Sequence, residues 1–285
     1  GGTVVVVPRF NPLSFWSTVR EHRVTWYSAV PTIHKLLLSR NKGSARPAGA
    51  EQLRFIRSCS APLTAPLMEE LENKFGVPVL EAYGMTEAAH QMSSNPLAPA
   101  KRKPGSVGCE TGIKIAILDA NGELLPDGTM GEVAIKGPSV FSGYEDNPEA
   151  NATAFTNGWF RTGDQGYLDS DHYLTLVGRI KEMIIRGGEK IAPIEIDEVL
   201  ASHPSVAEAV CFGVSHRIYG EEVAAAVVLN HEETEKTLLE YCRSLLADFK
   251  CPKVIYIVEA IPRTATGKIQ RRNVAAEISR PGEPT

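Results

Sequence analysis

The sequence LRFIRSCSAPLTAPLMEELENKFGVPVLEAYGMTE, residues 53–87, predicts a strand, a helix and a second strand in succession. Residues 53–60 and 77–83 are two runs rich in β-forming side chains, each of the length of a buried strand. Between them, apolar residues recur at the spacing of one helix face, and these are Leu67, Leu71 and Phe75. Pro66 is typical of a helix start and Gly76 of a helix end, so the stretch predicts one β-α-β unit.

The same alternation extends towards the N-terminus, where residues 24–30 form a β-rich run ended by Pro31 and residues 32–40 have helical spacing. Strands joined by helices of this length form a parallel sheet with right-handed crossovers. Ligands of such sheets bind beyond the carboxyl ends of the strands. Here those ends are Pro31, residues 58–62 and residues 83–87, so we expect these segments to converge on one rim.

Two further regions with different sequence patterns follow along the chain. Residues 105–177 contain short strands and turns, with a hairpin signal at Asn121-Gly122, which favours a small antiparallel barrel. Beyond residue 178, helices and strands are predicted at 193–200, 206–214, 223–229 and 237–249. The predicted fold class is therefore α/β in three parts: a partial parallel βαβ subdomain at 1–104, a small antiparallel β-barrel subdomain at 105–178, and an α+β domain at 179–285.

The composition is that of a soluble globular chain, with 285 residues of which 43% are hydrophobic and 22% charged. A net charge of -4 argues against nucleic acid and anionic membranes as partners. The longest apolar run, 223–229, is far shorter than the roughly 20 residues of a membrane span. Five cysteines without a CxxC pair indicate reduced thiols, so a cytoplasmic location is expected. Because residue 1 is Gly and an apolar run follows directly, we expect the chain to begin inside a fold.

Two short motifs combine residues suited to nucleotide chemistry. YGMTE, residues 83–87, offers a turn glycine, a hydroxyl and amide for a phosphate, and a carboxylate of the kind that Mg²⁺ prefers. The alternative is a strand end followed by a capped helix. TGD, residues 162–164, places a carboxylate after a turn, where it can accept two hydrogen bonds from ribose hydroxyls; a plain turn is the alternative.

Other motifs suggest a hinge between domains and a positive charge that could act on a phosphoryl group. GRIK at 178–181 and GGEK at 187–190 suit a hinge between domains, or alternatively a solvated linker. PRTATGKI at 262–269 is not a P-loop, but Lys268 can supply a positive charge to a developing phosphoryl charge. The basic cluster Lys268, Arg271 and Arg272 is the one feature that suits nucleic acid, and no aromatic residue is interleaved with it.

In this order the motifs resemble the adenylate-forming acyl-CoA synthetase superfamily. The resemblance runs from about Thr25 to Val274 and rests on SCSAP, YGMTE, GEVAIKGPSVFSGY, GWFRTGD, GRIKEMIIRGGEKIAPIEIDEVL and PRTATGKIQRR. It implies an enzyme that uses ATP and Mg²⁺ to convert a carboxylic acid to an acyl-adenylate and pyrophosphate, after which the thiol of CoA displaces AMP. It also implies that residues 179–285 form a lid that rotates between the two steps.

The resemblance assigns roles to individual residues of this chain. ATP or AMP binding is assigned to Ser60, Ala61, Pro62, Glu81, Tyr83, Gly84, Thr86, Asp164, Arg179 and Lys268. Among these, residues 60–62 and Tyr83 would flank the adenine, Thr86 would contact the α-phosphate, and Asp164 and Arg179 would hold the ribose. The catalytic residues would be Thr86 and Lys268. Lys268 would bridge the acyl carboxylate and the phosphate, and Glu87 would hold Mg²⁺. Lys181 matches the hinge, and Gly187, Gly188 and Glu189 match the loop that lines the channel for CoA.

Within the superfamily, residues 25–34, 55–61 and 85–97 resemble the oxalate–CoA ligase group of plants and fungi. By that likeness, Ser60 and His90 would receive the second carboxylate of the substrate. A protonated histidine and a hydroxyl supply the donors that a two-carbon diacid needs, whereas a fatty-acyl tunnel needs an apolar wall. The alternatives are a short- or medium-chain fatty-acid–CoA ligase, and a His90 that faces solvent or packs at a helix start.

The superfamily's phosphate loop, of the type TSGTTGxPKG, has no counterpart in residues 1–285. Because that loop holds the pyrophosphate end of ATP with backbone amides, these residues alone are expected to be inactive in adenylation. The chain is then a truncated product, a piece of a longer enzyme, or a non-catalytic nucleotide-binding module. A peroxisomal location would fit such relatives, but the C-terminus GEPT is not of the SKL type, so the cytoplasm is the expectation.

Overall fold

The computed structural model describes residues 2–41, 43, 45–264 and 269–278. The chain forms two compact units. Unit 1 contains residues 1–162 and 166–176, and unit 2 contains residues 163–165 and 177–285. The division passes through strands β9 (Trp159–Leu168) and β10 (Leu174–Arg179). The subdomain boundaries at residues 104 and 178 stay predictions.

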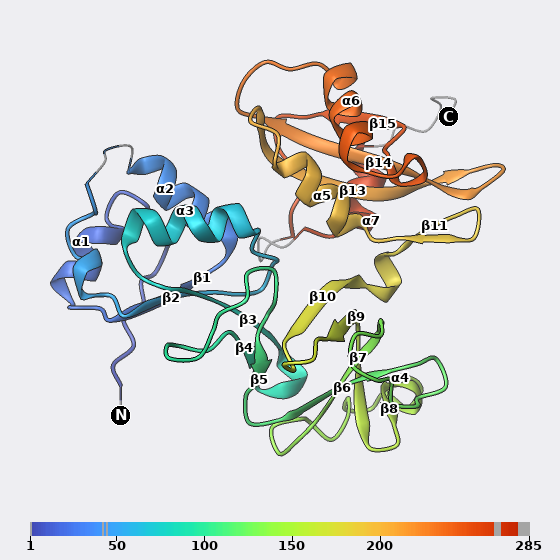
Figure 1. Cartoon of the computed structure of the whole chain (residues 1–285), viewed down its shortest axis with the longest axis horizontal. Helices are drawn as coiled ribbons and strands as arrows, with labels where there is room; N and C mark the ends of the chain where they lie inside the picture. Colours follow the sequence, from blue (N-terminus) through green and yellow to red (C-terminus); the bar gives the residue numbers. More distant parts are fainter. Residues whose placement is uncertain (1, 42, 44, 265–268, 279–285) are drawn as a thin grey trace. The chain divides into compact units, whose positions relative to one another are not determined.

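The first sheet of unit 1 has five strands in the order β1-β2-β3-β4-β5 (Figure 1). Its strands are β1 (Trp26–Ala29), β2 (Phe55–Ser58), β3 (Val79–Met85), β4 (His90–Ser94) and β5 (Cys109–Glu110). The first three are parallel, as the sequence predicts, and β4 and β5 are antiparallel to their neighbours. The helices here are α1 (Phe15–Glu21), η1 (Ala50–Gln52), α2 (Pro31–Arg40) and α3 (Ala65–Phe75). Helices α2 and α3 contact each other and share one apolar core with the parallel strands.

Helix α3 forms where the sequence predicts it. Pro66 lies in its first turn, where a missing N–H leaves no hydrogen bond unmade. Gly76 caps its end with φ +65°, and the N–H of Gly76 donates to the carbonyl of Glu72 at 2.8 Å. The apolar face of α3 is buried in the core, and its members are Leu67, Leu71 and Phe75. The prediction of one β-α-β unit over residues 53–87 is confirmed.

The chain after β3 does not form the capped helix that is the alternative interpretation of residues 83–87. A single 3₁₀ turn, η2 (Thr86–Ala88), leads directly into β4. Ala89 and His90 have φ of +53° and +91°, which an α-helix cannot accommodate and which turn the chain back along β3. His90 therefore opens a strand, and the idea that it packs at a helix start is wrong.

The second sheet of unit 1 has the order β10-β9-β7-β6, with β8 paired to β9. Its remaining elements are β6 (Lys114–Leu118), β7 (Gly131–Lys136), α4 (Pro148–Ala154) and β8 (Phe155–Thr156). The strand order is an open path, so the sheet is a half-barrel where the sequence favours a small barrel. The predicted turn at Asn121-Gly122 is present, with Gly122 at φ +86° and the carboxylate of Asp119 accepting from the N–H of Asn121 at 2.8 Å.

Unit 2 contains the predicted α+β module. Its sheet has the order β12-β11-β14-β13, with β15 parallel to β14. The strands are β11 (Ile184–Arg186), β12 (Glu189–Ile191), β13 (Val206–His216), β14 (Gly220–Leu229) and β15 (Val254–Ile257). The helices are η3 (Ile180–Glu182), α5 (Pro193–Ala201), α6 (Glu235–Leu245), η4 (Asp248–Lys250) and α7 (Arg271–Ile278).

Strand β14 explains the longest apolar run of the sequence. Val223, Ala225 and Val227 pack in a core with α5 and α6, whereas Ala224 and Ala226 pack in a second core with Val274 of α7. Both faces of the strand are thus covered, and a strand covered on both faces is apolar throughout rather than alternating. Within the described residues, no helix combines the length and the apolar character that crossing a membrane requires.

Candidate active site

Residues 58–62 leave the carboxyl end of β2 at the rim predicted to bind a ligand. Glu81 of β3 pairs in register with Ser58 and is only 5% exposed. Its Oε1 accepts a hydrogen bond of 2.9 Å from the backbone N–H of Leu63. This contact fixes the loop to the neighbouring strand, while the three residues Ser60, Ala61 and Pro62 are exposed. The structure thus brings the rim segments that follow β2 and β3 together on adjacent strands.

Gly84 lies where β3 and β4 approach each other. A Cβ on Gly84 would lie 1.8 Å from the carbonyl oxygen of His90, so a larger residue does not fit without moving a strand. The pairing is irregular between Tyr83 and Gly84, as at a β-bulge. Tyr83 is half-buried and packs against the core that contains Met92, whereas Thr86 is exposed. The glycine is therefore required by the backbone geometry that presents Thr86.

Glu87 is tied to a segment 57 residues further along the chain. The hydroxyl of Tyr144 donates to Glu87 Oε1 at 2.9 Å, and the N–H of Phe141 donates to the Glu87 carbonyl at 2.8 Å. Partial burial and the neighbouring carboxylate raise the pKa of the Tyr144 phenol, so the phenol keeps its proton and acts as donor. Sequence reasoning assigns no role to Tyr144, whose one signal is its place at the end of the motif GEVAIKGPSVFSGY.

His90 contacts Arg57, a residue to which the sequence gives no role. Arg57 Nη2 lies 3.4 Å from His90 Nδ1, and because a guanidinium can only donate, Nδ1 is the acceptor of this contact. Arg57 thus places a positive charge beside the imidazole ring of His90. Ser60 is linked to the pair through Cys59 and Ser28, with 3.7 Å from Ser60 Oγ to Cys59 Sγ, 3.4 Å from Cys59 Sγ to Ser28 Oγ, and 3.0 Å from Ser28 Oγ to Arg57 Nη1.

Asp164 and Arg179, the pair assigned to ribose, both lie in unit 2. Arg179 Nε is 3.1 Å from Asp164 Oδ1. The Asp164 side chain is 8% exposed and that of Arg179 is 62% exposed. The structure therefore brings these two residues together, with the guanidinium offsetting the charge of a nearly buried carboxylate.

Lys181, the residue predicted to be the hinge, is exposed within η3. Its neighbour Glu182 accepts a hydrogen bond of 3.1 Å from Nε of Arg271, which also donates to Asp197 Oδ2 at 2.7 Å. Arg271 begins α7, three residues after Lys268. Lys268 itself lies outside the described residues, so its predicted role stays a prediction.

Gly187 and Gly188 form the turn between β11 and β12. Their φ values of +58° and +94° fit a two-residue hairpin turn that favours glycine. The N–H of Gly187 donates to the carbonyl of Tyr219 at 2.9 Å, and the ring of Tyr219 lies under the guanidinium of Arg186 at 4.3 Å. Glu189 is exposed beside the turn. The loop is well supported, and its proposed contact with CoA stays a prediction.

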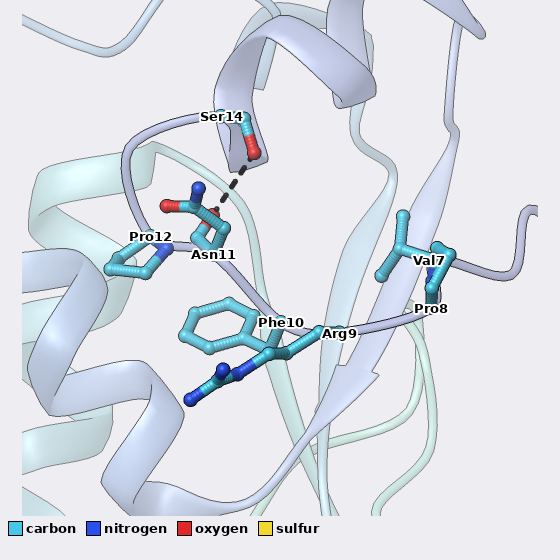
Figure 2. A pocket seen from close by; sticks show the side chains of 7 residues that line it. All are labelled: Val7, Pro8, Arg9, Phe10, Asn11, Pro12 and Ser14. Atoms are coloured by element: carbon cyan, nitrogen blue, oxygen red, sulfur yellow. Dashed lines mark hydrogen bonds between the residues drawn. The ribbon is translucent and has the colours of Figure 1, made fainter.

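A surface hollow of about 600 Å³ lies along the N-terminal segment (Figure 2). It is lined by Val7, Pro8, Arg9, Phe10, Asn11, Pro12 and Ser14. This lining comes from one continuous stretch and includes no predicted site residue. The hollow therefore contributes nothing to the nucleotide site.

Residues 1–145 match the family described as AMP-binding enzyme, and residues 195–268 match the AMP-binding enzyme C-terminal domain. The chain belongs to the AMP-binding enzyme family. The first match contains both rim loops, and the second ends at Lys268.

Curated relatives of this AMP-binding chain include CoA ligases of plants and yeast. It is 54% identical over 280 residues to the probable CoA ligase CCL9 of Humulus lupulus, covering 96% of this chain and 53% of the relative. The chain is 51% identical over 280 residues to an oxalate–CoA ligase of Arabidopsis thaliana, and the match covers 96% of this chain and 54% of the relative. It is 49% identical over 283 residues to an oxalate–CoA ligase of Saccharomyces cerevisiae, and this match covers 98% of this chain and 51% of the relative. The chain thus spans about half the length of the curated relatives it matches.

The fold of this AMP-binding chain matches solved structures as well. The ATP-bound MatB of Rhodopseudomonas palustris superposes with a TM-score of 0.87 at 35% identity, covering 95% of this chain and 54% of that one. The o-succinylbenzoate CoA synthetase MenE of Bacillus subtilis, in complex with its acyl-adenylate, superposes with a TM-score of 0.85 at 35% identity, covering 97% and 55%.

Proposed function

We propose that this chain supplies part of the active site of an AMP-forming acid–CoA ligase, and that the acid is oxalate. The observation that carries the proposal is the rim of unit 1, where Leu63, the residue after loop 60–62, donates to Glu81 of β3, two residues before turn 83–87. The two oxalate–CoA ligases that match nearly the whole chain support the choice of reaction and of acid. A short- or medium-chain fatty-acid–CoA ligase is the alternative.

The nucleotide contacts are proposed for each unit separately. In unit 1, loop 60–62 and the half-buried ring of Tyr83 flank the adenine, and the exposed hydroxyl of Thr86 donates to the α-phosphate. In unit 2, the carboxylate of Asp164 accepts from the ribose hydroxyls while Arg179 orients it. These assignments use a buried, oriented carboxylate for the sugar and an exposed hydroxyl for the phosphate.

Glu87 fits Mg²⁺ as one ligand of several. Among the described residues, no group of three or more His, Cys, Asp and Glu side chains is placed to hold a metal ion. Mg²⁺ is commonly bound by one or two carboxylates, with water and substrate phosphates completing its shell. Glu87 would hold the ion through its carboxylate, which Tyr144 orients, and the bound ion supplies charge neutralisation at the phosphates.

Two steps share this site. In adenylation, a carboxylate oxygen of the acid bonds to the α-phosphorus of ATP and pyrophosphate leaves, a step that needs placed cations and donors rather than a protein nucleophile. Thr86 and Lys268 would stabilise the charge that develops there. In the second step the thiol sulfur of CoA bonds to the acyl carbon and AMP leaves. Lys181 would serve as the hinge and residues 187–189 would line the path of the pantetheine arm.

The identity of the acid substrate is tested in a fusion protein, which is made by placing the phosphate-loop segment of the Arabidopsis relative before this chain. AMP release is measured with ATP, Mg²⁺, CoA and one of four acids: oxalate, malonate, butyrate or octanoate. We expect oxalate to give the highest rate. Release with butyrate or octanoate but not with oxalate would establish the fatty-acid alternative instead.

Two controls sharpen this test. The 285-residue chain without the added segment is expected to show no acid-dependent ATP–pyrophosphate exchange; exchange by this chain would mean that other residues hold the pyrophosphate. A fusion carrying His90→Ala is expected to lose oxalate turnover and to retain ATP binding. Unchanged oxalate turnover in that variant would remove His90 from the site. AMP binding without turnover of any acid would support a non-catalytic nucleotide-binding module.

A further inference from the structure

Arg57 lies at the centre of a group of polar side chains that the roles above leave unexplained. We call it the Arg57 cluster, and its members are Ser28, Arg57, Cys59, His90 and Gln91. Arg57 is on β2, in register with Ser28 of β1. Since successive side chains of a strand point to opposite faces, Arg57 points away from the core that holds its neighbour Ile56.

Three contacts hold the guanidinium in place. Nε donates to Gln91 Oε1 at 3.2 Å, Nη1 donates to Ser28 Oγ at 3.0 Å, and Nη2 donates to His90 Nδ1 at 3.4 Å. Gln91 is itself oriented, because its Nε2 donates to Thr111 Oγ1 at 3.3 Å. A guanidinium carries five N–H groups, so these contacts leave one N–H on each terminal nitrogen. Two such groups match the two oxygens of a carboxylate.

Within the residues that the structure describes, the charge of Arg57 has no carboxylate counter-ion. Its three partners are a hydroxyl, an amide and an imidazole, and none of the ion pairs found there includes Arg57. By contrast, Arg179 and Arg271 are each paired with a carboxylate. An oriented cation without an anion at the end of a ligand-binding sheet is suited to an anionic group of the ligand.

We propose that Arg57 binds the second carboxylate of the acid and so selects dicarboxylic over monocarboxylic substrates; this rests on the proposed ligase function. His90, which accepts from Arg57 at Nδ1, adds its Nε2–H as a donor beside the guanidinium. Ser60 is connected to the same cluster through Cys59. An apolar acyl chain placed here would remove water from Arg57 without pairing its charge, which disfavours a fatty acid.

The first test uses the 285-residue chain and does not depend on catalysis. The side-chain Nε–H signals of ¹⁵N-labelled arginine are followed by NMR while oxalate or butyrate is added at equal ionic strength, and Arg57→Lys identifies the Arg57 signal. We expect a saturable shift of that signal with oxalate and none with butyrate. The signal of Arg54, an exposed residue just before β2, serves as the control and is expected to stay unchanged. No saturable shift at Arg57, or an equal shift with butyrate, overturns the proposal.

The second test uses the fusion protein and the ratio of kcat/KM for oxalate to that for butyrate. Arg57→Gln is expected to lower this ratio by about 10- to 100-fold, the usual effect of losing hydrogen bonds to a charged group. Arg57→Lys retains the charge without the planar pair of donors and is expected to lower it less. Arg54→Gln, which removes one positive charge outside the cluster, is expected to leave the ratio unchanged. An unchanged ratio in Arg57→Gln overturns the proposal, whereas a fusion that uses no acid overturns the ligase function and leaves the NMR result to decide on Arg57.

Discussion

Arg179 Nε lies 3.1 Å from Asp164 Oδ1, and the two side chains differ sharply in exposure, at 62% and 8%. The ion pair with an exposed guanidinium gives the nearly buried carboxylate a fixed direction. The two residues therefore have separable effects: Asp164 contacts the ligand, whereas Arg179 orients Asp164.

The first prediction concerns ribose recognition by Asp164. Asp164→Asn in the 285-residue chain is expected to weaken AMP binding by about 10- to 100-fold, because hydrogen bonds to a charged acceptor contribute about 1.5–3 kcal/mol. Titration calorimetry with AMP and with 2′,3′-dideoxy-AMP gives the measurement. The parent chain is expected to prefer AMP, and the variant is expected to lose most of that preference.

Asp248→Asn is the matched control, since it neutralises an exposed carboxylate of the same unit. It is expected to bind both nucleotides as the parent does. If Asp164→Asn keeps the full preference for AMP over the dideoxy compound, the carboxylate does not contact the ribose.

A second prediction follows from the close approach at Gly84. Gly84→Ala would place a Cβ 1.8 Å from the carbonyl oxygen of His90, so β3 and β4 must separate locally. We expect the free energy of unfolding to fall by about 1–3 kcal/mol, as for other overpacked sites. Urea unfolding followed by tryptophan fluorescence measures it, because Trp16, Trp26 and Trp159 all belong to unit 1.

Gly43→Ala is the control for this substitution. A Cβ at Gly43 meets nothing within 4 Å, so the change is expected to be neutral or slightly stabilising through the unfolded chain. Equal stability of the Gly84→Ala and Gly43→Ala variants would show that the strands adjust without strain.

The regular part of unit 1 could be predicted from the sequence because its signals are local. The apolar spacing of Leu67, Leu71 and Phe75 specifies α3, and Gly76 ends it within the same segment. Parallel pairing of β1, β2 and β3 then follows from the helices between them. Each of these inferences needs fewer than about 15 neighbouring residues, the window in which periodicity is read.

Strand β4 and the contacts of the site could not be predicted in this way. The segment HQMSS has no strict alternation, and its burial arises from pairing with β3 and β5. Arg57 and Gln91 are 34 residues apart, and Tyr144 and Glu87 are 57 apart. A lone arginine in a β-rich run carries no local sign of such partners, so only the assembled sheet reveals the cluster.

The third prediction tests the contact between Tyr144 and Glu87. Tyr144→Phe keeps the ring against Phe141, 4.8 Å between centroids, and removes the hydroxyl that orients the carboxylate. In the fusion protein, we expect the Mg²⁺ concentration for half-maximal pyrophosphate exchange to rise about 10-fold, as when other groups that orient metal ligands are removed. Tyr167→Phe, in the same unit, removes a hydroxyl outside this contact and is expected to behave as the parent. An unchanged Mg²⁺ requirement in Tyr144→Phe would separate this contact from metal binding.

The last prediction concerns acid stability and a histidine outside the site. His34 of α2 is fully buried, and burial lowers its pKa from the ordinary 6.5 to about 4. Between these two pKa values the unfolded chain binds a proton that the folded chain does not. The free energy of unfolding therefore falls as the pH drops below 6.5, and this contribution levels off below about 4. From about pH 7.5 to pH 5 the loss expected from His34 alone is about 2 kcal/mol.

Urea unfolding of His34→Leu at the same two pH values isolates this contribution, because the other titrating groups are shared with the parent chain. The variant is expected to lose about 2 kcal/mol less than the parent over this range. His22→Leu, which changes an exposed histidine of unit 1, is expected to keep the pH dependence of the parent, since its surroundings change little on unfolding. A His34→Leu variant with the parent's pH dependence would mean that the buried ring is protonated in the folded chain, with acid lability arising from other groups.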